Sequence, residues 1–141
     1  MKTPWHLWVV GIVTLLWNAM GAFDYLMTKL RVESYMANFT PEQLDFFYGF
    51  PAWVTVTWAI AVWGSVLGSV LLLLRRGLAV MVFAISFLGM AVTSFHNFFL
   101  SDVSMAELMG PAAIGFSAAI FIVGVLLIVY SRAMRQRGVL V

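Results

Sequence analysis

The chain contains no cysteine, and only 10% of its 141 residues are charged. The absence of cysteine excludes disulfide bonds, thiolate metal ligands and a redox-active dithiol, and with them a vitamin K reductase-like or disulfide-exchanging membrane enzyme. Histidine is scarce as well, and the two that exist, His6 and His96, fall at opposite ends of their hydrophobic stretches, where they cannot be axial ligands of one haem. No cluster of His, Asp and Glu has metal-ligand spacing, so we assign no catalytic residue, no metal site and no cofactor.

Hydrophobic residues make up 63% of the chain and gather in four long stretches. The stretches cover residues 5–28, 51–74, 78–100 and 111–130. Each has the ~20 apolar residues that are needed to cross a hydrocarbon core about 30 Å thick. We therefore predict an all-α membrane protein, an antiparallel bundle of four transmembrane helices that forms a single integral membrane domain over residues 1–141.

The basic residues at the ends of the stretches predict the orientation. With the N-terminus inside, six lie on the cytoplasmic side (Lys2, Arg75, Arg76, Arg132, Arg135 and Arg137) and two lie outside (Lys29 and Arg31). This bias follows the positive-inside rule and predicts that both termini are cytoplasmic. The net charge of +2 reflects this flank pattern and gives no reason to expect nucleic acid as a partner.

The longest connection follows the first stretch, and it contains a helix-start signal. Thr40 is placed as an N-cap, Pro41 as the first helical residue and Gln43 as the third residue of a capping box. We predict a short helix over residues 41–48, lying at the membrane interface in the first periplasmic loop. A lid over an outward-facing site and a plain interfacial anchor both fit this segment, and the anchor is the simpler interpretation.

Polar and small residues recur at steps of three and four along the first and third stretches, so each set shares one helix face. Asp24 and His96 each lie about one turn from the outer end of their stretch, which puts a carboxylate and an imidazole at similar depth. Polar groups within a membrane are candidate functional sites. We predict a polar ligand pocket between spans one and three, formed by Asp24, His96, Asn18, Tyr25, Thr93 and Asn97. The alternative is that Asp24 and His96 are hydrated at the headgroups, or only hold helices together.

The second stretch carries a ridge of small residues formed by Ala61, Gly64, Ser65 and Gly68. Small residues at this spacing let two membrane helices approach closely. The pattern predicts a tight helix interface, without saying whether the partner helix belongs to the same chain. Because one bundle of this size has little interior space, we expect a homo-oligomer or docking on a larger membrane complex.

A family resemblance is carried by Trp17-Asn18, Gly21-Ala22, Asp24-Tyr25, Thr40-Pro41-Glu42-Gln43, Phe50-Pro51-Ala52-Trp53 and Ala61-Val62-Trp63-Gly64. On these segments the chain resembles a family of short, uncharacterised bacterial inner-membrane proteins of four helices, some of which carry a loose sugar-transporter label. The resemblance implies a multi-pass protein of the bacterial inner membrane and supplies no site residues.

Three hypotheses for function remain open at this point. The first is a binding or accessory protein that serves a larger membrane assembly or holds a lipid-like ligand. The second is a small-solute transporter with a periplasm-facing polar pocket between spans one and three. The third is a membrane-embedded enzyme that uses Asp24 and His96 as acid and base; it has least support, because no nucleophile or metal accompanies them.

Overall fold

The computed structural model describes residues 3–100 and 110–141, and every element that it assigns there is helical. The elements are α1 (Trp5–Lys29), α2 (Glu33–Met36), α3 (Pro41–Tyr48), α4 (Ala52–Leu73), α5 (Leu78–Phe95), the π-helical turn η1 (His96–Leu100) and α7 (Pro111–Gln136). Four helices, namely α1, α4, α5 continued by η1, and α7, are long and apolar enough to cross a membrane, which confirms the four predicted stretches. Lys2, Asp102 and Glu107 lie outside the described residues.

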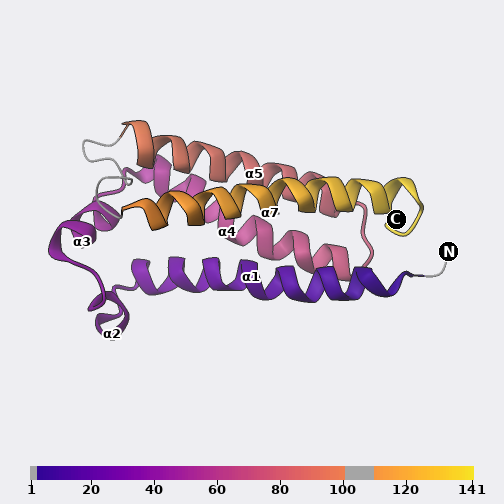
Figure 1. The fold of residues 1–141 in the computed structure, drawn as a ribbon, viewed down its shortest axis with the longest axis horizontal. Helices are drawn as coiled ribbons and strands as arrows, with labels where there is room; N and C mark the ends of the chain where they lie inside the picture. Colours follow the sequence, from indigo (N-terminus) through magenta and orange to yellow (C-terminus); the bar gives the residue numbers. More distant parts are fainter. Residues whose placement is uncertain (1–2, 101–109) are drawn as a thin grey trace.

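The four long helices lie lengthwise and alternate in direction along the chain (Figure 1). Both termini and the link between α4 and α5 lie at one end, while α2 and α3 lie at the other. The basic residues of the α4–α5 link and of the end of α7 are thus at the same end as the termini. The membrane topology that this arrangement would take remains a prediction.

Helix α4 is the centre of the bundle, because it packs along both α5 and α1. Its small residues allow the close approach to α5: Gly68 lies against the ring of Phe83, and Gly64 lies against Ser86. The Ser86 hydroxyl also donates a hydrogen bond to the carbonyl oxygen of Ala61, at 2.6 Å. The small residues Ala61, Gly64 and Gly68 therefore face a helix of the same chain.

The buried core lies near the end that holds the termini, which we call the closed end. It is a cluster of eight side chains: Leu7, Leu72, Ala79, Phe83, Leu127, Met134, Val139 and Leu140. Leu72 and Leu7 are 0% exposed, although most large apolar side chains of the long helices face outward, as they do in a protein surrounded by lipid.

The last residues of the chain contribute to this core, which the sequence did not predict. Helix α7 continues beyond residue 130 to Gln136, and Gly138 then turns the chain with a φ of +77°. The Val139 N–H donates to the carbonyl of Met134, which is the helix-ending bond of a Schellman motif. Val139 and Leu140 are buried as a result, and the Val141 N–H donates to the Arg75 carbonyl at 2.9 Å.

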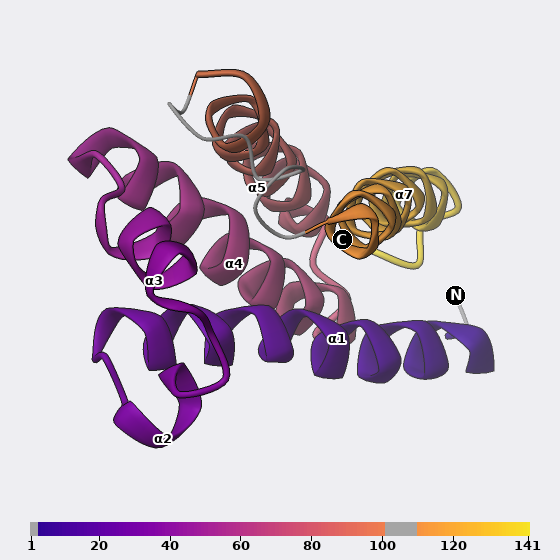
Figure 2. The same cartoon turned by 60° about the vertical axis from the view of Figure 1, so that its left-hand side comes forward.

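Helix α7 packs mainly on α5 and stands apart from α1 and α4 over much of its length (Figure 2). Its contact with α5 includes Gly124 against the ring of Phe87, and the Phe87 and Phe121 rings, whose centroids are 5.5 Å apart. Towards its N-terminus, α7 reaches α1 through the Phe116 and Trp17 rings at 5.8 Å. The four helices are therefore tightly joined at the closed end and less so beyond it.

The connection between α1 and α4 forms α2 and α3. The predicted short helix is present as α3, with both bonds of the capping box: Gln43 N–H to Thr40 Oγ1 at 3.2 Å, and Thr40 N–H to Gln43 Oε1 at 3.0 Å. Helix α2 is a single turn that the sequence did not predict. Both lie at the end of the bundle opposite the closed end (Figure 1), where they can contact the ends of the long helices.

Candidate ligand-binding cavity

A cavity of about 510 Å³ occupies the part of the bundle between the closed end and α2–α3. Side chains from α1, α4, α5, η1 and α7 line it, together with residues of the α1–α4 connection. Phe83 and Leu127, which belong to the buried core, also form the wall nearest the closed end. We call this part of the molecule the cavity half.

Aromatic rings form much of the wall at the end of the cavity half. Four of them come from the α1–α4 connection, and we call this set the aromatic cap: Tyr35, Phe39, Phe47 and Phe50. Successive ring centroids in the cap are 6.1, 5.4 and 6.3 Å apart, within the range of edge-to-face attraction. Phe50 continues the series to Trp58 of α4 at 5.6 Å, so the cap is joined to a spanning helix.

Asp24 is the only carboxylate or basic side chain among the described residues that line the cavity. It lies on α1 and accepts a hydrogen bond from the hydroxyl of Tyr35, which comes from α2. Burial, together with the adjacent Asp24 carboxylate, raises the pKa of Tyr35 to about 12. The phenol therefore remains a hydrogen-bond donor at neutral pH, and it fixes one oxygen of the carboxylate.

Asn18, one turn and a half before Asp24, also lines the cavity, but its amide is already used between helices. Its side-chain nitrogen donates to Ser69 Oγ at 2.9 Å and to the Ser65 carbonyl at 3.2 Å. These two bonds tie α1 to α4. The amide nitrogen of Asn18 therefore joins two helices, and its amide oxygen is the atom that could accept a hydrogen bond from a group in the cavity.

The structure does not bring Asp24 and His96 together. Whereas Asp24 is bonded to Tyr35, His96 Nδ1 lies 3.1 Å from Asn97 Oδ1. The His96 ring is edge-on to Trp53 at 5.4 Å and to Phe50 at 5.9 Å, and it does not line the cavity. His96 thereby connects the aromatic cap to the end of α5, which is a positioning role.

Of the remaining predicted site residues, two line the cavity and one does not. Thr93 and Asn97 line the cavity, and the Thr93 hydroxyl donates to the Gly89 carbonyl at 2.8 Å and lies 2.8 Å from Thr57 Oγ1. Tyr25 does not line the cavity; its ring packs on Trp58 at 4.7 Å. The cavity that Asn18, Asp24, Thr93 and Asn97 share is also walled by α4 and α7, so it is not confined to the space between spans one and three.

Two successive polar residues of the third span, His96 and Asn97, are buried where the π-helical turn η1 begins. A π turn holds more residues than an α turn, which shifts the faces of the residues that follow. His96 and Asn97 are only 8% and 9% exposed, and they serve different surroundings: the ring contacts the cap, whereas Asn97 lines the cavity. The polar stripe of this span thus ends in two adjacent buried residues with different neighbours.

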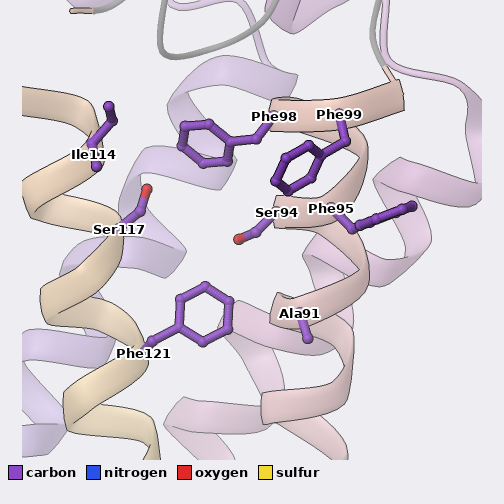
Figure 3. Close-up of a pocket in the computed structure, with 8 residues that line it drawn as sticks. All are labelled: Ala91, Ser94, Phe95, Phe98, Phe99, Ile114, Ser117 and Phe121. Atoms are coloured by element: carbon purple, nitrogen blue, oxygen red, sulfur yellow. The ribbon is translucent and has the colours of Figure 1, made fainter. Parts of the chain in front are cut away.

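A second hollow of about 460 Å³ lies between the end of α5 and the start of α7 (Figure 3). Its wall is formed by phenylalanine rings, by Ala91 and Ile114, and by two hydroxyl side chains, Ser94 and Ser117. In Figure 3 the rings of Phe98 and Phe121 lie above and below the level of these serines. We call this hollow the lateral groove.

The functional residues that sequence reasoning missed come from the loop and from the last helix. Tyr35 is the partner of Asp24, and Phe116 and Ser117 of α7 line the cavity. The one signal that could have found Tyr35 is its four-residue spacing from Phe39, which places two aromatic rings on one side of a turn. Over residues 3–100 and 110–141, no three His, Asp or Glu side chains are placed to hold a metal ion.

No family model matches the chain, and neither a curated protein nor a solved structure matches it significantly.

Proposed function

We propose that this polytopic membrane protein holds an amphipathic, lipid-like ligand, with its apolar tail in the cavity and a positively charged end beside Asp24. The observation that carries the proposal is the cavity itself: about 510 Å³ of space with a largely apolar and aromatic wall and, among the described lining residues, a single carboxylate. Ligand sites of this size combine an apolar wall with a few polar groups that fix the orientation.

The shape of the cavity suits an acyl or alkyl tail. It is bounded by Phe83 and Leu127 towards the closed end, and it extends to the aromatic cap at the other. The apolar part of such a wall favours an apolar guest over water. In a bilayer, where lipid tails are as apolar as leucine, filling it with a hydrocarbon chain costs little.

The polar end of the cavity suits a cation. Asp24 supplies a negative group that is oriented by Tyr35, and the rings of Tyr35, Phe39 and Trp58 line the same cavity. Aromatic faces attract ammonium groups, and the attraction grows to about 2 kcal/mol when the cation is desolvated. A carboxylate among aromatic rings, without a basic side chain in the described wall, therefore favours an ammonium headgroup over a phosphate or carboxylate one.

Tryptophan fluorescence tests the proposal directly. Trp17 and Trp58 line the cavity, whereas Trp5, Trp8, Trp53 and Trp63 are between 41% and 74% exposed on the outer surface. The cavity-tryptophan variant keeps Trp17 and Trp58 and replaces the other four by Phe. The probe is an alkylammonium with bromine atoms in its tail, compared with an alkyl sulfate of the same tail. We expect saturable quenching by the ammonium probe, at roughly tenfold lower concentration than by the sulfate.

Asp24→Asn in the same variant should remove the preference for the ammonium probe. Asp45→Asn is the matched control, because Asp45 is an exposed acidic residue of α3 that does not line the cavity. Quenching that rises linearly with probe concentration, equally for both headgroups and for a variant that keeps only the four outer tryptophans, would contradict the proposal.

A small-solute transporter is the second candidate, favoured by the polar groups of Asn18, Asp24, Thr93 and Asn97 on the cavity wall. The closed end favours ligand binding over transport, because the fully buried side chains of Leu72 and Leu7 block the path of a solute beyond the cavity. A fluorescent alkylammonium added to sealed vesicles distinguishes the two. Transport predicts that the probe reaches the inner leaflet and that Asp24→Asn abolishes this at normal expression, whereas holding predicts binding without leaflet exchange.

We also propose that both termini are cytoplasmic, that α2 and α3 lie at the periplasmic surface of a bacterial inner membrane, and that the protein works in a homo-oligomer or as an accessory subunit. Support for the orientation comes from the positive-inside rule and from the common end that the termini share with the α4–α5 link and the end of α7 (Figure 1). Arg75 belongs to that link and Arg135 to that end of α7. Because the chain lacks cysteine, Glu42→Cys and Arg137→Cys can each be probed with an impermeant maleimide on spheroplasts. We expect only Glu42→Cys to be labelled, and the reverse result would invert the topology.

Native mass spectrometry of protein extracted with its own lipids tests the assembly. A second polypeptide at fixed ratio would support an accessory role, and a lipid adduct that Asp24→Asn loses would support the ligand site. A bare monomer without an adduct would contradict both.

A further inference from the structure

We infer that the ligand reaches the cavity sideways from the bilayer, through the lateral groove between α5 and α7. This inference rests on the proposed function, because it concerns how a lipid-like ligand enters the same cavity. It depends on three features of the structure: the shared wall of the two hollows, the apolar outer rim, and the unequal packing of α7 along its length.

The two hollows have three residues in common. Ser94, Phe98 and Ser117 line both the lateral groove and the cavity. Ser94 and Phe98 come from the α5–η1 side, while Ser117 comes from α7. In Figure 3 the Ser94 side chain extends from α5 towards α7, and the Ser117 side chain faces it from across the gap. These three side chains are thus the partition between the outer groove and the inner cavity.

The outer rim of the groove is apolar. Phe99 is 76% exposed there, and Phe95 and Ile114 are about half exposed. In a spanning protein such side chains contact lipid tails, so an alkyl chain can move from the bilayer into the groove without crossing water. The two serines are small, and their hydroxyls can exchange hydrogen bonds with a polar headgroup as it passes.

The packing of α7 on α5 is unequal along its length, and it leaves a gap between the two helices in the cavity half. Near the closed end α7 is held to α5 by Gly124 on Phe87 and by Leu127 in the core. Beyond Phe121, the two helices are separated by the groove. The opposite side of the cavity is closed by α4, whose small residues pack directly on α5 and whose Ser65 and Ser69 bond to Asn18 of α1. A ligand that entered between α4 and its neighbours would have to break these contacts.

The test links α5 to α7 across the partition. In the cavity-tryptophan variant, Ser94→Cys and Ser117→Cys are introduced together. Because the chain has no cysteine of its own, a thiol cross-linker can react only with this pair. A short reducible thiol cross-linker closes the pair, and the brominated alkylammonium is then added to the protein in vesicles. We expect the rate of quenching to fall by roughly tenfold or more in the linked form and to recover on reduction, as expected when a gate limits access. Protein that is linked after loading should also lose the probe more slowly.

The matched control pair links the same two segments at the closed end. A side chain at Gly77, just before α5, would lie 3.5 Å from Cδ of Arg135 on α7, so Gly77→Cys with Arg135→Cys can take the same cross-linker. This pair should leave the rate of quenching unchanged. The reduced protein of each pair is the reference for its linked form, because the two differ only in the cross-link.

The outcomes separate the route from the proposed function. A linked Ser94–Ser117 pair that quenches at the rate and amplitude of its own reduced form would overturn the lateral route and leave ligand binding intact. Equal slowing by both pairs would also overturn it, since the effect would then come from restraining α7 as a whole. The absence of saturable quenching in every form, reduced ones included, would overturn the proposed function and the route together.

Discussion

The closed end and the cavity half of this bundle are held together in different ways. At the closed end, side chains from α1, α4, α5, α7 and the C-terminal residues converge on one buried cluster, in which Leu72 and Leu7 have no exposed surface. In the cavity half, by contrast, the contacts are edge-to-face aromatic pairs and isolated hydrogen bonds around the cavity. The difference shows how a small helical bundle can keep a large cavity: one end and the α4–α5 interface supply the packing, and the cavity lies at the other end.

A lipid bilayer around the four long apolar helices would make this division possible. Between lipid-exposed helices no hydrophobic driving force favours closure, and association depends on van der Waals packing and hydrogen bonds. A gap in the cavity half is therefore not penalised by water, and lipid chains can fill it. The comparison makes distinct predictions for substitutions in the two halves.

The largest effect is expected for Leu72→Ala at the closed end. Removing a fully buried leucine side chain leaves a void among Leu7, Phe83 and Leu127, and we expect a loss of stability of about 2–5 kcal/mol. Ile120→Ala removes a similar volume from the cavity wall, where the space is already open, and should cost less than about 1 kcal/mol. Reversible unfolding in mixed micelles measures both, and equal losses would show that the two halves are equally packed.

A smaller effect is expected for the C-terminal residues. Leu140→Ala should destabilise the protein by roughly 1–3 kcal/mol, because Leu140 is 2% exposed within the core cluster. Val141→Ala is the adjacent control, since that side chain is 91% exposed while its N–H keeps the bond to Arg75. If the two variants unfold alike, the C-terminal residues do not complete the closed end in solution.

Much of the fold could be predicted because its signals are local. Four apolar runs of spanning length, separated by charged or turn residues, are sufficient for α1, α4, α5 and α7. The start of α3 follows from Thr40, Pro41 and Gln43, whose side chains cap their own helix. Likewise, the small residues of α4 indicate a close helix contact, and the structure adds that the partner is α5.

The cavity was harder to predict because its residues meet through tertiary geometry. Depth along a span suggests His96 as the partner of Asp24, but a loop side chain, Tyr35, reaches the carboxylate instead. The π-helical turn begins at His96, whose ring packs on Trp53 and on Phe50 of the aromatic cap, and no local sequence rule marks such a turn. The lining by α7 and the return of Leu140 to the core also depend on where a distant helix is placed.

The bond between Tyr35 and Asp24 makes the cavity half sensitive to alkaline pH. The pKa of Tyr35 is raised to about 12 by burial and by the Asp24 carboxylate, above the unfolded value of roughly 10. The native state therefore holds this proton more tightly, so its contribution to stability is fully present below pH ~10 and is lost as the pH rises through about 12. We expect on the order of 1 kcal/mol, because the phenol is partly exposed and solvent screens the interaction.

Tyrosine titration followed by phenolate absorbance, with Tyr35→Phe as the difference reference, measures this pKa. Asp24→Asn should return the Tyr35 pKa towards 10, while Asp45→Asn should leave it near 12. Leu72→Ala, at the other end, should change the stability without moving the Tyr35 pKa. A Tyr35 pKa that is insensitive to Asp24→Asn would mean that the carboxylate and the phenol are not bonded.

The smallest effects are expected where an arginine ends a helix in each half. Arg75 at the closed end and Arg31 beside α2 both have left-handed backbone conformations, with φ of 58° and 51°, in Schellman-type helix ends that favour glycine. Glycine relieves a strain of about 1 kcal/mol at such a position.

Each arginine also makes one contact: Arg75 Nη1 donates to Thr3 Oγ1 at 2.8 Å, and the Arg31 guanidinium lies 4.1 Å from the Tyr48 ring centroid. The hydrogen bond of Arg75 is exposed and worth little, so Arg75→Gly should stabilise the protein by up to about 1 kcal/mol. Arg31→Gly also loses a cation–π contact of about 0.5–1 kcal/mol and should be nearly neutral. Unfolding of the two variants side by side measures the difference, and equal stabilisation would mean that the Arg31–Tyr48 contact does not help to hold the α1–α4 connection over the cavity.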